Sequence, residues 1–178
     1  MSFSKDYVLK KINSAYFASH DIKNYEDRED GLVMEAEFHV HSEKYVLSKK
    51  AQLYEMDSNE YVYVYYIPHL TKELFESYVN KAYDDGFPKI EPKSGHRSSY
   101  IVAEFLCDTT DEDAIKALKK YRRRQSFHFS LYGWMEVHTL LVDLGTESVS
   151  CNADGRLTGK FMKNVLHPRK RRGIRLFK

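Results

Sequence analysis

Four side chains capable of acid–base or metal-ligand chemistry lie at every second position near residue 40. Glu35, Glu37, His39 and His41 alternate with apolar residues in EAEFHVH. In a β-strand, residues two apart point to the same face, so these four predict one polar stripe. Carboxylates and imidazoles transfer protons and bind metal ions. Such a stripe is also typical of the solvated face of a half-buried strand, and both interpretations stay open.

A second group of this kind occurs in the other half of the chain. His128 lies between two phenylalanines, and Glu136 and His138 are two apart in the next strand pattern. A hairpin that turns at Tyr132 and Gly133 would place His128 near Glu136 or His138. Imidazole and carboxylate would then be within reach of a zinc-type ion. Because no ligand quartet of recognised spacing is present, we expect no metal and no other cofactor.

Together these side chains define a candidate ligand or metal face: His39, His41, His128, Glu136 and His138. A deep polar pocket joining the four histidines would favour a small-ligand protein or a metal-dependent enzyme. Motif searches give no such support. The chain contains no phosphate-binding glycine loop, no dinucleotide fingerprint, no nucleophile elbow, no H-E-x-x-H and no C-x-x-C. Catalytic residues are therefore not predicted by motif, and a non-enzymatic protein is favoured.

Cationic side chains gather in two clusters that suggest an anionic partner. The last ten residues hold six of the 28 lysines and arginines and no acid, so residues 1–168 carry 22 cations against 26 anions. A second cluster lies at 119–124. If the fold joined them, they would attract a nucleic acid or another polyanion without sequence preference. The candidate residues are Arg122, Arg123, Arg124, Arg169, Lys170, Arg171, Arg172 and Arg175.

The same tail contains three apolar side chains that a purely electrostatic arm does not need. Ile174, Leu176 and Phe177 would be buried if the tail docked as a strand or an amphipathic segment. A basic terminus can also be merely solvated, so its role is left open.

Tyrosines alternate with valines in EYVYVYYI, so both faces of this segment are apolar. Tyr61, Tyr63 and Tyr65 predict a central strand that is covered on both sides, or a subunit interface. With one face open, they would instead form an aromatic platform for bases, sugars or a protein. The abundance of aromatic strands also predicts a homo-oligomer, because interfaces are enriched in such residues.

The first half of the chain predicts an α-β-β-β-α order. Apolar residues at helical spacing indicate a helix over 4–20 with Ser4 as N-cap, and strand patterns follow at 32–40, 44–56 and 60–67, with turn chemistry at 57–59. A second helix over 69–86 begins at the capping residue Thr71 and ends at Gly86. Residues 87–97, with two prolines, are a candidate linker.

The second half repeats this order after one strand at 98–107. A helix is predicted over 109–124, with a capping box of Thr109 and Glu112. Strand patterns follow at 126–131, 134–144 and 147–152, and a helix over 160–167 stops at Pro168.

These elements predict one compact α+β domain over 1–168, with possible halves 4–86 and 98–167, and a basic tail over 169–178. Two meanders suggest a largely antiparallel sheet with helices packed on one face, built as a pseudo-repeat of two α-β-β-β-α halves. No segment is apolar enough to span a membrane or to act as a secretory signal. Cys107 and Cys151 are too few and too far apart for a disulfide scaffold or a metal clip, which indicates reduced thiols in the cytoplasm.

The function that the sequence favours is a cytoplasmic, bacterial, non-enzymatic binding module for a protein or an anionic polymer. The alternative is a small-ligand or metal-dependent enzyme that uses the His/Glu stripe.

Overall fold

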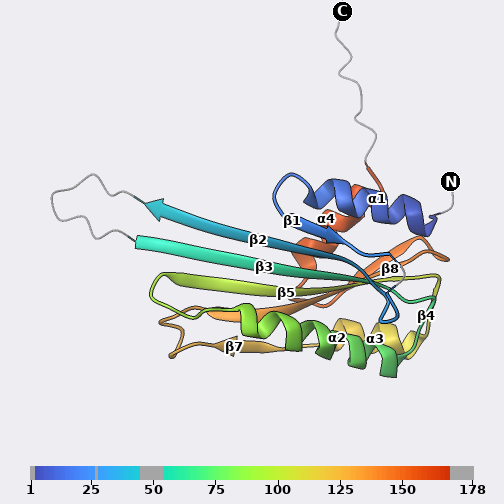
Figure 1. The fold of residues 1–178 in the computed structure, drawn as a ribbon. Coiled ribbons are helices and arrows are strands. Elements are labelled where there is room, and N and C mark those ends of the chain that lie inside the picture. Colours follow the sequence, from blue (N-terminus) through green and yellow to red (C-terminus); the bar gives the residue numbers. More distant parts are fainter. Residues whose placement is uncertain (1–2, 27, 45–53, 169–178) are drawn as a thin grey trace, which may run out of the picture.

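The computed structural model describes residues 3–26, 28–44 and 54–168, and for 40–44 and 54–57 it describes the backbone alone. Within this part of the chain, a seven-stranded sheet has the order β1-β2-β3-β5-β8-β7, and β9 also pairs with β8 (Figure 1). Its strands are β1 (Asp21–Asn24), β2 (Leu32–Lys44), β3 (Tyr54–Tyr66), β5 (His96–Cys107), β7 (Arg124–Ser126), β8 (Trp134–Asp143) and β9 (Ser148–Cys151).

Four α-helices belong to the described residues: α1 (Lys5–Tyr16), α2 (Lys72–Gly86), α3 (Glu112–Lys120) and α4 (Arg156–Leu166). The 3-10 turn η1 (Phe87–Lys89) follows α2, and β4 (His69–Leu70) pairs with β6 (Thr109–Thr110) in a small parallel sheet. In the described ranges, no helix is both long enough and apolar enough to cross a bilayer.

The sheet is mixed, and most of its pairs are antiparallel, so the α+β class is confirmed. The pairs β3–β5 and β5–β8 are parallel, because α2 and α3 carry the chain back across the sheet between them. The remaining main-sheet pairs are antiparallel. The arrangement does not show a repeat of two α-β-β-β-α halves.

Helices cover both faces of the sheet, so the prediction that they pack on one face is wrong (Figure 1). The helices α2 and α3 pack over Tyr63, Ile101 and Val137, and α1 and α4 pack over the opposite face around Val64 and Val102. The reason lies in the central strands, which carry apolar side chains on both faces and therefore need two covers. Tyr61, Tyr63 and Tyr65 are buried, which confirms the core interpretation.

Several predicted boundaries hold because the local capping chemistry is satisfied. The hydroxyl of Ser4 accepts a hydrogen bond from the Tyr7 amide, and that of Thr71 accepts one from the Leu74 amide. At α3 the prediction of a capping box is wrong, because Asp111 rather than Thr109 is the N-cap. Thr109 instead belongs to β6 and pairs with His69 of β4.

Three strand predictions need correction. Residues 57–59, predicted as a turn, lie inside β3. The edge strand β1 was not predicted, because the strand patterns begin only at residue 32. The strand predicted over 126–131 ends at Ser126, after which His128, Phe129 and Ser130 have positive φ angles of 45°, 55° and 69°. Backbone hydrogen bonds within 127–133 hold this turn.

Candidate functional site

The predicted histidine face does not come together in the described residues. The His39 ring packs edge-on against Tyr61 at a centroid distance of 5.7 Å and pairs with Asn59, on the face of α2 and α3. His138 packs against Tyr100 on the opposite face. His41 is paired with Asp57 in the β2–β3 ladder, but its side chain lies outside the described part of the structure.

His128 is also separated from the residues that it was expected to approach. Its ring packs at a tilt against Tyr132, with centroids 4.5 Å apart, within the turn after β7. The residue opposite Glu136 in the β7–β8 ladder is Arg124. Glu136 and His138 do meet, with Oε1 and Nε2 3.2 Å apart. Among the described residues, no group of three or more His, Cys, Asp or Glu side chains is arranged to hold a metal ion.

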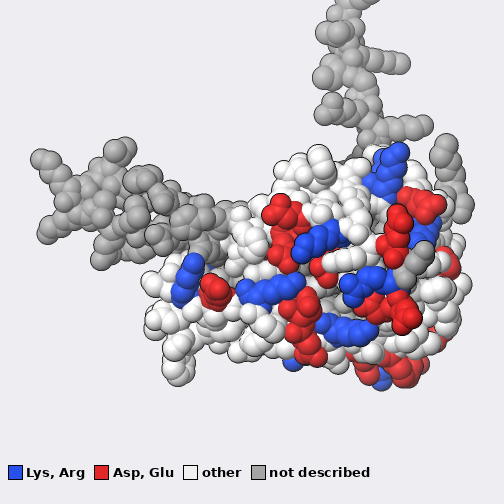
Figure 2. Space-filling model, viewed as in Figure 1, with Lys and Arg blue, Asp and Glu red and all other residues white. Residues whose placement is uncertain are grey.

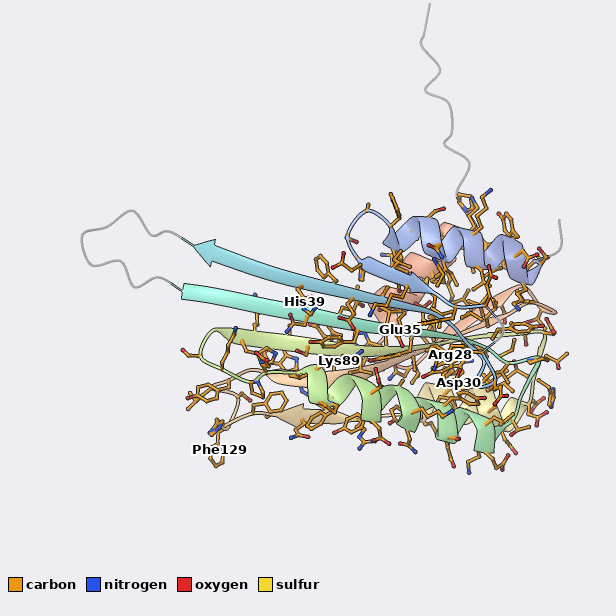
Figure 3. The ribbon with its side chains drawn as sticks, viewed as in Figure 1. Arg28, Asp30, Glu35, His39, Lys89 and Phe129 are labelled. Carbon is orange, nitrogen blue, oxygen red and sulfur yellow. The ribbon has the colours of Figure 1, made fainter. Side chains whose placement is uncertain are left out.

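One carboxylate of the predicted stripe, that of Glu37, belongs to a network of ion pairs at the end of α2. The Lys89 Nζ lies 3.0 Å from Glu37 Oε1 and 2.9 Å from Asp85 Oδ2, and Tyr63 donates a hydrogen bond to Asp85. Although partial burial acts to raise it, the pKa of Asp85 is lowered by these two donors. Figure 3 labels Lys89, next to the end of α2, together with Glu35 and His39 of β2. Glu35 accepts a hydrogen bond from Tyr25 at 3.0 Å. Lys89 contacts Glu37, Asp85 and Tyr63, and Tyr63 in turn contacts Asp85. These contacts hold β2 and β3 against the end of α2.

The described arginines of the predicted polyanion site point to different parts of the molecule. The Arg123 guanidinium lies 3.2 Å from the centroid of the Tyr83 ring, on α2. Arg122 pairs with Asp154, and Arg124 approaches Glu136 at 3.8 Å. On the face shown in Figure 2, lysines and arginines are interspersed with acids. The remaining candidates, Arg169, Lys170, Arg171, Arg172 and Arg175, lie outside the described residues.

The cluster that sequence reasoning did not identify lies on the other face, between α1 and α4. The two helices pack antiparallel, with Phe3 near His167 at one end and Tyr16 near Phe161 at the other. At the second end they leave a cleft of about 340 Å³ over the sheet. It is lined by Ala15, Tyr16, Ser19, His20, Glu60, Leu157, Thr158 and Phe161.

A buried carboxylate contacts Tyr16, one of the residues that line this cleft. Glu104 is 2% exposed, and its Oε1 accepts a hydrogen bond of 2.7 Å from the Tyr16 hydroxyl. Its Oε2 is also buried and has no hydrogen-bond partner among the described residues. Burial, together with the charge of Glu60, raises the pKa of Glu104 to about 7, although the hydrogen bond from Tyr16 acts in the other direction. Burial and the Glu104 charge also hold the pKa of Tyr16 well above its usual value.

A second carboxylate is open to the cleft. Glu60 Oε2 lies 3.3 Å from His20 Nε2, and the His20 ring is held between Tyr16 and Phe38 at centroid distances of 4.7 and 5.1 Å. The walls around this pair are apolar and aromatic. Leu157 and Phe161, one turn apart on α4, are 82% and 41% exposed. The cleft therefore combines negative charge with apolar surface.

The Glu136–His138 pair borders the same cleft through Thr158. The Thr158 hydroxyl lies 3.4 Å from His138 Nδ1, on the opposite side of the ring from Glu136. Buried Asn152 fixes the start of α4 against β8, because its Oδ1 accepts hydrogen bonds from the amides of Thr139 and Gly155. The arrangement contains a hydroxyl that could act as a nucleophile (Thr158), an imidazole that could act as its base (His138) and a carboxylate that could orient the imidazole (Glu136).

One signal for this site was present in the sequence. Glu104 is the single charged residue in SSYIVAEFLC, a strand that is otherwise apolar or small. A charge at such a position is rarely buried without a reason. The contribution of Tyr16, His20 and Thr158 could not be found in this way, because it depends on how two helices distant in sequence pack together.

A comparison with known families shows that residues 4–164 match the model of a family described as Domain of unknown function (DUF8052). No curated protein and no solved structure matches the chain.

Proposed function

We propose that this chain, which belongs to the DUF8052 family, is a binding protein whose cleft between α1 and α4 takes an organic cation with an apolar stem. The observation that carries the proposal is the pair of carboxylates at the cleft. Glu60 lines the cleft, and Glu104 is buried in contact with the lining residue Tyr16 and has an unpaired Oε2. A protonated amine next to Glu60 would be attracted by that carboxylate and, above the Glu104 pKa of about 7, by the Glu104 carboxylate as well, more strongly than at a fully exposed site.

The walls of the cleft supply the complementary part of the site. Tyr16 and Phe161 present aromatic rings 6.1 Å apart, and Leu157 adds an aliphatic side chain. Aromatic faces attract cations, and an apolar stem gains free energy when such surfaces are removed from water. The ligand class is therefore an amine on an alkyl or aromatic stem.

The anionic-polymer partner predicted from the sequence stays a second proposal for a different surface. Arg122, Arg123 and Arg124 do not form one patch, so such binding would depend on residues 169–178. We also retain a cytoplasmic, bacterial setting as part of the proposal, supported by the unpaired thiols of Cys107 and Cys151 in the described chain. Self-association is a further proposal, for which Phe129 and Leu131, 100% and 78% exposed, are the candidate contacts.

Isothermal titration of the full chain with hexylamine tests the proposed function. We expect saturable binding that is at least ~10-fold weaker in Glu60→Gln, because the neutral amide keeps the shape of the cleft and removes its charge. Glu91→Gln is the matched control, since Glu91 is exposed and lies in the segment between η1 and β5, which contributes no residue to the cleft. Equal affinity of the wild type and Glu60→Gln would refute the assignment.

A further inference from the structure

We infer that Thr158, His138 and Glu136 form a catalytic group for acyl transfer, with amine-bearing esters as the substrate class. The recognition of the amine rests on the proposed function, because Glu60 and Thr158 line the same cleft. The chemistry of the three residues rests on their own geometry.

The three side chains form a continuous line of contacts. His138 Nε2 lies 3.2 Å from Glu136 Oε1, and His138 Nδ1 lies 3.4 Å from Thr158 Oγ1. When Nε2 carries the proton, it donates to the carboxylate, and Nδ1 is left as an acceptor that faces the threonine hydroxyl. Contacts between a nucleophile and its base are commonly loose before a substrate is bound, so 3.4 Å suits this role.

The surroundings hold the imidazole in this orientation. The His138 ring is 8% exposed and packs on the Tyr100 ring at a centroid distance of 4.9 Å. On the outer side, Arg124 Nη1 approaches Glu136 Oε2 at 3.8 Å, while Glu136 Oε1 faces the histidine. A ring fixed between an aromatic face and a charged acceptor is preorganised for one tautomer.

The threonine is placed by the start of α4. The Gly155 amide donates a hydrogen bond of 2.8 Å to Asn152 Oδ1. If residue 155 carried a side chain, its Cβ would lie only 3.2 Å from His138 Cβ. The glycine thus permits the close approach of α4 to β8 that puts Thr158 beside the imidazole. Thr158 lies in the first turn of the helix, where the positive end of the helix dipole favours a developing oxyanion.

The step is a nucleophilic substitution at an ester carbonyl. Thr158 Oγ forms a bond to the carbonyl carbon while its proton passes to His138 Nδ1, and the ester C–O bond then breaks as that proton goes to the departing alcohol. Water attacks the acyl-threonine in the reverse sense, which releases the acid and restores the hydroxyl. Glu136 is a positioning residue that stabilises the charged imidazolium.

Two esters with the same six-carbon acyl chain, one of them ending in an amine, separate the chemistry from the recognition of the amine. Release of nitrophenol is measured from para-nitrophenyl hexanoate and from para-nitrophenyl ε-aminohexanoate, with the full chain. We expect turnover of both esters and a higher kcat/KM for the aminohexanoate. Thr158→Val, which removes the hydroxyl and keeps the shape, should reduce kcat by ~100-fold or more for both esters. Ser14→Ala, on the exposed side of α1, should match the wild type.

Two further readouts exclude a merely structural effect. Glu136→Gln should lower kcat and change its pH profile with KM unchanged, while Glu136→Asp retains most of the rate. Intact-mass analysis during turnover should show one added acyl group, located on the peptide that contains Thr158, and none in Thr158→Val.

The outcomes distinguish this inference from the proposed function. Turnover of Thr158→Val at the wild-type rate, an absence of turnover by the wild type, or acylation elsewhere would overturn the catalytic assignment, and hexylamine binding would be unaffected. If Glu60→Gln retains the preference for the aminohexanoate, the proposed function fails and the catalytic assignment stands.

Discussion

The carboxyl group of Glu104 is the most unusual single group in the described chain, because it is buried beside another carboxylate and only one of its oxygens is paired. Its pKa of about 7 means that folding favours the protonated acid over the carboxylate. Between the ordinary value of 4.5 and about 7, the folded state binds more protons than the unfolded state. Stability contributed by this group is therefore present at low pH and is lost as the pH rises through that window.

We predict that Glu104→Gln abolishes this pH dependence. The amide keeps the contact with Tyr16 and does not ionise, so the free energy of unfolding of the variant, relative to the wild type, should rise by about 3 kcal/mol between pH 4.5 and pH 8. Denaturant unfolding of both proteins at several pH values measures the difference. The groups that face Glu104 are Tyr16 and Glu60, and Tyr16 does not titrate in this range because its pKa is raised well above its usual value. Parallel pH profiles for the two proteins would show that Glu104 is not the titrating group.

At the scale of elements, the placement of α4 on β9 depends on a glycine. A Cβ at Gly159 would lie 2.5 Å from Cys151 Sγ and 3.0 Å from Cys151 Cβ. Elsewhere in a helix, replacement of glycine by alanine stabilises by about 1 kcal/mol. Here the overlap must displace the helix or the strand, and the cost of such overpacking is about 1–3 kcal/mol.

We therefore expect Gly159→Ala to destabilise the protein, and Cys151→Ala to restore part of the loss by removing the nearest atom. Thermal unfolding of the two single variants and of the double variant forms a cycle that measures their coupling. Additive effects would mean that the two side chains do not meet. Because α4 carries Thr158 and Phe161, the same displacement should also weaken hexylamine binding.

The sequence predicted local elements better than their arrangement. Ser4 and Thr71 begin their helices as expected, since capping depends on residues a few positions apart. The face that each helix covers depends on the parallel return of β5 and β8, and the pattern of apolar residues alone does not specify it. The site shows the same difference between local and long-range information. The spacing of Glu136 and His138 in the sequence identified them as a pair, whereas Thr158 is brought next to His138 only by packing between segments that are distant in sequence.

At the scale of the whole molecule, charge is divided between a mildly acidic body and a basic tail that lies outside the described residues. A form ending at His167 loses the tail and keeps every described helix and strand. We predict that it elutes from heparin at lower salt than the full chain, because fewer cations remain to release counterions from a polyanion. Equal elution of the two forms would remove the tail from any polyanion site. A lower Tm with unchanged elution would assign it to the fold.

The cleft assigns ligand binding to the face of the sheet that α1 and α4 cover, and not to the face that α2 and α3 cover. The groove between α2 and α3 is larger, at about 710 Å³, and is lined by Lys72, Lys116 and Lys120 together with acids. Its lysines would repel a cationic ligand, so we expect no hexylamine binding there, and this groove is the control site within the same molecule.

Amide chemical-shift mapping of the isotope-labelled full chain with hexylamine locates the bound amine residue by residue. We expect saturable shifts confined to the end of α1, to Glu60 and to the first half of α4, and we expect Glu60→Gln to lose them. Saturable shifts around Lys72 and Lys116, or an absence of saturable shifts anywhere, would contradict the assignment of ligand binding to this cleft.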